Sequence, residues 1–304
     1  MTAAFSRAWR RFWFEASPPE ALGLCRILFF TGLFLYELPV RPSLWAGVAD
    51  VFWMPIQAFR ILHLPLLPAS ALLAAEIVWK ISLAAAAIGL ATRASTIIAF
   101  GLGFYLLGLQ NNFGKIHHRD AAVVLALLVL AFSQCGAALS ADGWITSRKR
   151  PGRVPPDLSA EFTWPARLVQ VLVTFVFFSA GVSKLRHAGL EWITSDNLAI
   201  VLRQLQHPVS TRRPWLSWGV EIARHRGLCR ALAAGVLATE VASPLALVSR
   251  RARFLLVPGQ ILLLIAIRAL LGPQFLQVIF CEVFWIVPLR RSKAGGAFPA
   301  AGRE

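Results

Sequence analysis

Long apolar runs, separated by short polar and proline-bearing segments, dominate the chain. They approach the roughly 20 residues that a helix needs to cross a bilayer. They lack the short alternating segments expected of a membrane β-barrel. The pattern predicts an all-α polytopic transmembrane bundle of about eight spans, with interfacial amphipathic helices beside them. The predicted spans are residues 21–38, 70–90, 96–109, 121–139, 168–182, 231–247, 254–271 and 275–289.

The two ends differ from the region between them. Residues 1–20 place aromatic side chains among arginines and end at Pro18 and Pro19, which predicts an N-terminal amphipathic helix lying in the membrane interface. Residues 21–290 form the predicted transmembrane domain. Residues 291–304 are rich in Gly, Ala and Pro, and we expect a disordered basic tail.

Composition supports a membrane environment. Hydrophobic residues make up 57% of the 304 residues, and charged residues only 15%, against about 25% in ordinary soluble domains. The net charge of +16 comes mainly from basic clusters between and beyond the apolar runs. This is the distribution of positive-inside loops near anionic lipid, so we expect the lipid bilayer and not nucleic acid as partner. We expect a multi-pass protein of a cell membrane, the bacterial inner membrane.

The segment 186–230 conflicts with that distribution. With eight spans and both ends cytoplasmic, this arginine-bearing segment falls outside, against the positive-inside rule. Either the segment needs cations on the outer side, or the number of spans is off by one. The sequence leaves both readings open.

Seven charged residues lie within the predicted spans and an eighth, Lys184, follows directly after the run 168–182. Each is costly at mid-bilayer unless paired. Glu76 and Lys80 are four residues apart and can pair on one helix face. Glu37 and Arg268 lie near span ends, where snorkelling explains them. Lys184 and Glu240 have no such simple explanation. The full set is Arg26, Lys80, Lys184 and Arg268 against Glu37, Glu76, Glu240 and Glu282.

The turn 110–120 is the densest polar cluster between apolar runs, and it contains Asn111, Asn112, His117 and His118. The histidines could be ordinary interfacial residues, or could handle protons together with the two asparagines. Metal ligation is the weakest reading, because adjacent histidines diverge on a helix and no H-x-x-x-H spacing is present. The four cysteines form no C-x-x-C pair, so we expect free thiols and no metal site.

Several blocks, in order, resemble one family. Residues 179–185 read SAGVSKL and are followed by Trp192. Residues 139–144 read LSADGW, and Arg26 lies in LCRILF. These blocks resemble the HTTM family, the membrane domain shared by vitamin K-dependent γ-glutamyl carboxylases and many bacterial proteins. The resemblance covers roughly residues 20–290.

The resemblance implies roles for particular residues. Lys184 matches the lysine base that begins oxidation of the reduced quinone in the carboxylases, and His117 or His118 matches the region of an assisting histidine. A lysine in an apolar pocket loses its proton more readily, which suits a base. We expect Arg26, Asn111, Asn112 and Glu240 to line the cofactor site. The chain ends soon after the last run, so we expect it to lack the carboxylases' large extramembrane C-terminal domain.

Two functional hypotheses follow. In the first, the protein has an intramembrane pocket for a quinone or lipid, and is a carboxylase- or epoxidase-like or redox-linked enzyme with Lys184 as base. In the second, it is a non-catalytic membrane component that assists maturation or export of a peptide, and its internal charges only hold helices together. A transporter ranks third, because no internal repeat is evident.

Overall fold

The computed structural model describes residues 3–114, 120–150, 157–206, 214–273 and 275–286. In this part of the chain the regular structure is helical, apart from one β-bridge between Ser17 and Ser159. The α-helices are α1 Ala3–Phe14, α2 Pro19–Glu37, α3 Gln57–Ile61, α4 Ala69–Ile88, α5 Thr92–Leu109, α6 Ala121–Phe132, α7 Ala141–Lys149, α8 Trp164–Ala188, α9 Glu191–Thr194, α10 Asn197–Gln206, α11 Gly219–Ile222, α12 Arg226–Val241, α13 Leu245–Val248, α14 Arg250–Ala266 and α15 Gln277–Glu282. Short 3₁₀ segments are η1 Pro42–Gly47, η2 Asp50–Phe52, η3 Gln110–Asn112, η5 Ala160–Phe162 and η7 Val283–Ile286, and η6 Ile267–Leu271 is a π-helical turn.

The all-α membrane class is confirmed, but the number of about eight spans is not. Within the described residues, five helical segments are long and apolar enough to cross a membrane, and α6 is a shorter apolar helix. The five are Pro19–Glu37, Ala69–Ile88, Thr92–Asn112, Ala160–Ala188 and Arg250–Leu271.

The predicted span 121–139 is too long in its second half. Helix α6 ends at Phe132, and Ser133 is extended. The chain then folds into a compact turn in which Leu139 has a φ of 52°. The carbonyl groups of Cys135 and Leu139 accept hydrogen bonds from the Arg26 side chain. A distant arginine therefore takes the carbonyls that a continuing helix would have used, and hydropathy alone does not reveal this.

The last predicted spans are also broken. The run 231–247 divides into α12 and α13 around Pro244, where the sequence predicts a kink, and the hydroxyl of Ser243 bonds the backbone of Thr174 in α8. The run 275–289 contains α15 and η7 in its described part. These are too short to cross a bilayer by themselves.

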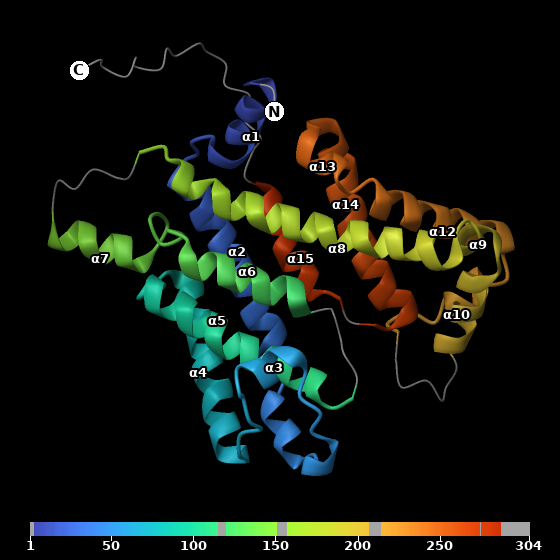
Figure 1. The fold of residues 1–304 in the computed structure, drawn as a ribbon, viewed down its shortest axis with the longest axis horizontal. Coiled ribbons are helices and arrows are strands. Elements are labelled where there is room, and N and C mark those ends of the chain that lie inside the picture. The colour runs from blue at the N-terminus through green and yellow to red at the C-terminus, as the bar shows by residue number, and fades with distance from the viewer. Residues whose placement is uncertain (1–2, 115–119, 151–156, 207–213, 274, 287–304) are drawn as a thin grey trace.

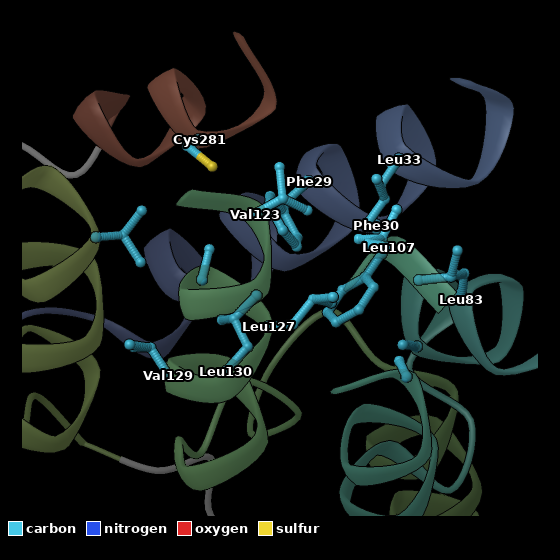
Figure 2. Close-up of a cluster of buried hydrophobic side chains, with 14 of the residues drawn as sticks. Phe29, Phe30, Leu33, Leu83, Leu107, Val123, Leu127, Val129, Leu130 and Cys281 are labelled. Carbon is cyan, nitrogen blue, oxygen red and sulfur yellow. The ribbon is translucent and has the colours of Figure 1, made fainter. Parts of the chain in front are cut away.

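The core forms around α2, which passes through the middle of the molecule in Figure 1. Helices α4, α5, α6, α8 and α15 contribute to it. Phe29 and Phe30 are fully buried and meet edge to face, and the ring of Phe284 in η7 lies 5.8 Å from that of Phe29. Figure 2 shows the rings of Phe29 and Phe30 among aliphatic side chains of α4, α5 and α6. Apolar residues thus join five longer helices, α2, α4, α5, α6 and α8, to the last helical segments described, α15 and η7.

A second group of helices packs on the other part of α8. Helices α9, α10 and α12 lie at its C-terminal end, with α14 beside α12 (Figure 1). The amphipathic segment expected after α8 is present as two helices, α9 and α10. Helix α8 therefore packs against both groups of helices, and its buried face contacts side chains of both.

The expected N-terminal amphipathic helix is α1. Three aromatic side chains of this helix are at least half exposed and lie beside its basic residues: Phe5, Trp9 and Phe14. Its end is tied to the start of α8, because the hydroxyl of Thr163 donates to the backbone carbonyl of Glu15. The expected basic tail, 291–304, lies outside the described residues.

Candidate functional site

One buried face of α8 carries a series of polar side chains. Its buried positions recur every three or four residues, so they form a single stripe along the helix. Arg167, Gln170 and Thr174 lie on the stripe near the N-terminal end, and Gly181 lies near the C-terminal end. Lys184 follows Gly181 by three residues and continues the same stripe.

Lys184 and Glu240 are brought together across α8 and α12. The Lys184 ammonium lies 2.6 Å from one Glu240 carboxylate oxygen and 2.7 Å from the other. The Glu240 side chain is 6% exposed and that of Lys184 is 21% exposed. The pair is therefore shielded on the glutamate side and partly open on the lysine side.

The pair depends on the close approach of two helices. A Cβ atom on Gly181 would lie 3.0 Å from the Cβ of Glu240 and 2.9 Å from a methyl group of Val241. Only glycine leaves room for α12 at this level of α8. The Gly-x-x-Lys spacing of the SAGVSKL block thus serves one contact: the glycine admits α12, and the lysine one turn later binds the glutamate of α12.

Trp192 covers the pair from α9. The Lys184 ammonium lies 5.3 Å from the centroid of the Trp192 ring, within cation–π range. The buried indole N–H of Trp192 has no hydrogen-bond partner among the described residues. The site therefore offers a charged pair, an aromatic face and one free donor.

Arg26 is used differently from what the sequence suggests for a cofactor ligand. It is completely buried, and its guanidinium donates to the backbone carbonyls of Cys135, Ala86, Ala87 and Leu139 at 3.1, 2.6, 3.1 and 2.5 Å. It closes the C-terminal end of α4 onto the turn after α6. The cofactor-binding role of Arg26 stays a prediction, and the bonds observed are structural.

The LSADGW block contacts the turn between α4 and α5, next to the carbonyl groups that Arg26 binds. The Asp142 carboxylate accepts hydrogen bonds from the backbone N–H groups of Ala91 and Thr92 and from the Thr92 hydroxyl, at 2.8, 2.7 and 2.8 Å. These groups begin α5, so Asp142 caps that helix from a distant part of the chain. Burial alone would raise the pKa of Asp142, but the hydrogen bonds from Thr92 and Ala91 outweigh it and hold that pKa below its usual value.

The two asparagines lie at the end of α5, away from the Lys184 pair in the fold. Asn112 is fully buried, and its side-chain N–H groups donate to the carbonyls of Gly108 and Leu109. Its side-chain oxygen accepts from the backbone of Ile56 at 2.8 Å. Asn111 is buried beside it. Asn112 fixes the segment before α3 to α5, and a cofactor role for either asparagine stays a prediction.

His117 and His118 lie outside the described residues, so their predicted catalytic roles stay predictions. Asp120, just after them, lies beside a cavity of about 90 Å³ that Glu37, Gln110 and Gln277 also line. The Asp120 carboxylate accepts hydrogen bonds from Gln110 and, at 3.0 Å, from Gln277. Pockets for drug-sized ligands are about 300 Å³ or larger. The cavity is therefore smaller than a typical ligand pocket.

The remaining internal charges agree only in part with the pairing and snorkelling that the sequence predicts for them. Glu76 and Lys80 pair at 2.8 Å, as their spacing predicts. Arg268 lies over the Trp215 ring, 4.7 Å from its centroid. Glu37 does not reach outward from its span end, because it is buried and 2% exposed.

Sequence reasoning missed several buried polar residues. Gln277 and Gln260 are isolated amides in apolar runs, and Arg167 and Arg253 lie at the beginnings of runs, where they look like flanking charges. All four are buried. Helical spacing is the sequence signal that could have indicated the burial of Arg253 and Gln260. The buried residues of α14 share one face and are Arg253, Leu256, Gln260 and Leu264.

Comparison with protein families finds one model that matches, described as HTTM domain, over residues 14–254. Neither the curated proteins nor the solved structures compared with this chain give a match. The matched range contains Arg26, the LSADGW block, Lys184, Trp192 and Glu240.

Proposed function

Because the chain belongs to the HTTM domain family, which makes it a multi-pass membrane protein, we propose that it acts on a reduced quinone dissolved in the bilayer. Lys184 is the base, and Glu240 is the group that accepts a proton from Lys184. The observation that carries the proposal is the Lys184–Glu240 pair, with both carboxylate oxygens within 2.7 Å of one ammonium.

The proposal rests first on the energetics of a shielded ion pair. Removing an ammonium and a carboxylate from water is costly for each, and their attraction only partly offsets this cost. Transfer of one proton from Lys184 to Glu240 removes both charges together. The proposal takes Glu240 as the acceptor of that proton, which leaves Lys184 as the neutral amine that a general base requires.

The chemical step involves protons only. The neutral Lys184 amine takes the proton of a hydroquinone hydroxyl, so that an O–H bond breaks and an N–H bond forms. The products are a hydroquinone monoanion and the Lys184 ammonium, which lie in contact with opposite charges. The net change is movement of one proton from the hydroquinone to Glu240, and no electron is transferred.

The surroundings of the pair suit a flat, lipophilic guest. The Lys184 side chain is partly exposed while Glu240 is shielded, so a guest meets the amine and not the carboxylate. The Trp192 ring supplies an aromatic face, and its unpartnered N–H can donate to an oxygen of the guest. These features support a hydroquinone over an aliphatic lipid.

The test compares binding of a lipophilic naphthohydroquinone with binding of its dimethyl ether by the purified protein in detergent, without oxygen. We expect the wild type to prefer the hydroquinone, and Lys184→Met to weaken that preference by about tenfold, because one charge-assisted hydrogen bond is lost. Lys80→Met is the matched control, since Lys80 also pairs with a glutamate but inside a single helix. Equal binding of both ligands by the wild type contradicts the proposal.

The alternative is a non-catalytic component that assists maturation or export of a peptide. It is favoured by the structural use of Arg26, Asn112 and Asp142, whose bonds all join segments of the chain. In that case the Lys184–Glu240 pair only holds α8 to α12. Lys184→Met then lowers the amount of folded protein in the membrane, and neither ligand distinguishes it from the wild type.

A further inference from the structure

Two arginines are buried together at the N-terminal ends of α8 and α14. Arg167 is 1% exposed and Arg253 is 8% exposed. The 3₁₀ segment η7 connects them through Phe284 and Trp285. Gln170, which accepts a hydrogen bond from Arg167, donates to the carbonyl of Phe284, and the Arg253 guanidinium lies 4.5 Å from the centroid of the Trp285 ring.

The charges of these arginines are not balanced by the described part of the chain. The two guanidinium groups repel one another. Glu15 attracts Arg167, but neither arginine has a carboxylate within 4.0 Å among the described residues. Burying like charges without a counterion is costly in a low dielectric. The arrangement therefore calls for an anion.

Unused donors accompany the unbalanced charge. The Nε of Arg167 and one terminal nitrogen of Arg253 are buried and lack a hydrogen-bond partner in the part of the chain that the structure describes. Trp13 contributes a third such donor. Its ring meets Phe12 edge-on, and the Arg167 guanidinium lies over the Phe12 ring at 5.2 Å. A site with several N–H donors and a double positive charge is suited to an oxyanion with several acceptor oxygens.

The position in the fold indicates where such an oxyanion comes from. Figure 1 places α1, α13 and the beginning of α8 at the same end of the molecule. Helix α1 exposes aromatic side chains beside its arginines, as interfacial helices do at headgroup depth. Arg250 and Arg251, on the first turn of α14, are exposed nearby. Phospholipid phosphate is the abundant oxyanion at that depth.

We propose that Arg167 and Arg253 bind the phosphate of an anionic phospholipid, which enters between α1 and the N-terminal ends of α8 and α14. The phosphate oxygens accept the unused guanidinium N–H groups and neutralise the repelling pair. The acyl chains lie along the exposed apolar surface of α14, where Phe254 and Leu255 are largely exposed. This site is independent of the Lys184–Glu240 pair.

The experiment measures the thermal unfolding of the full chain in a neutral detergent, with added phosphatidylglycerol or phosphatidylcholine. We expect phosphatidylglycerol to raise the Tm by several degrees and phosphatidylcholine to have little effect. In Arg253→Gln and Arg167→Gln the phosphatidylglycerol needed for half of the effect rises by about tenfold, because a charge-assisted bond is lost. Arg251→Gln is the matched control, with the same charge change on an exposed position of α14, and it keeps the wild-type response.

A second arm uses inorganic phosphate without lipid. A shift of Tm that phosphate reproduces, with the same dependence on Arg253, assigns the site to a free anion and overturns the lipid assignment. An equal loss of response in Arg251→Gln and Arg253→Gln overturns the site itself. If the glutamine variants fail to fold, native mass spectrometry of Arg253→Lys decides: we expect less retained phosphatidylglycerol than in the wild type, and unchanged retention contradicts the proposal.

Discussion

Arg26 illustrates how a buried charge in a membrane protein can be satisfied mainly by backbone carbonyl groups. Its donors are directed at four backbone carbonyls at the end of α4 and in the turn after α6. A planar guanidinium can serve several acceptors at fixed angles, whereas an ammonium cannot replace it. At the scale of single residues, the polar blocks of this chain therefore divide into two kinds: those that close turns, and the Lys184 pair, which is left partly open.

Replacing Arg26 tests its structural role. We expect Arg26→Gln to lower the free energy of unfolding by about 3 kcal/mol or more, because buried carbonyl groups lose charged donors. Arg26→Lys should recover only part of this loss. Thermal or denaturant unfolding in detergent measures the change, and Arg93→Gln, at an exposed position of α5, is the control. Equal stability of the Arg26 and Arg93 variants contradicts the role.

At the scale of elements, the turn between α4 and α5 shows why helix boundaries need partners from elsewhere in the chain. Gly89 ends α4 with a φ of 72°, and Ala91 has a φ of 44°, a left-handed conformation that costs about 1 kcal/mol for a residue other than glycine. Arg26 and Asp142 bind the two sides of this turn. Two distant motifs thus hold one short loop in a conformation that its own sequence does not favour.

The Asp142 contact predicts a pH dependence. Its pKa is lowered in the folded protein, so its contribution to stability is fully present above the unfolded pKa of about 4 and is lost as the pH falls through the lower folded pKa. We expect Asp142→Asn to be less stable than the wild type at neutral pH, and the difference to shrink at pH values below about 4. Unfolding measured over this pH range checks it. A difference that stays constant on acidification contradicts the ionic contact.

Much of the element pattern could be predicted from the sequence, because helix spacing and hydropathy are local. The N-terminal amphipathic helix and the long helices α2, α4, α5, α8 and α14 agree with the runs that predict them. The runs 121–139 and 231–247 were wrong in length, because Arg26, Ser243 and Pro244 make contacts or breaks that hydropathy averages away. The sequence alone indicates that Lys184 and Glu240 are unusual charges beside apolar runs. Their pairing depends on the approach of α12 at Gly181, which a single sequence does not encode visibly.

At the scale of the whole molecule, two groups of helices share α8. The first contains the fully buried aromatic core around α2, and the second contains α9, α10, α12 and α14. The stripe on α8 carries Lys184 of the charged pair near one end, and near the other end it carries Arg167, one of the two arginines of the proposed phosphate site. Our two proposals place the lipophilic guest and the anionic guest at opposite ends of α8.

The most direct measurement of the central claim is an optical titration of a lipophilic naphthohydroquinone with the detergent-solubilised protein, under oxygen-free conditions. The wild type is predicted to lower the pH at which the bound hydroquinone ionises, and Lys184→Met to leave it at the value of the free compound. The double variant Lys184→Glu, Glu240→Lys restores the ion pair but moves the amine to the shielded side. It is predicted to fold and not to lower that pH. Ionisation at the same pH with the wild type and with Lys184→Met would contradict the account.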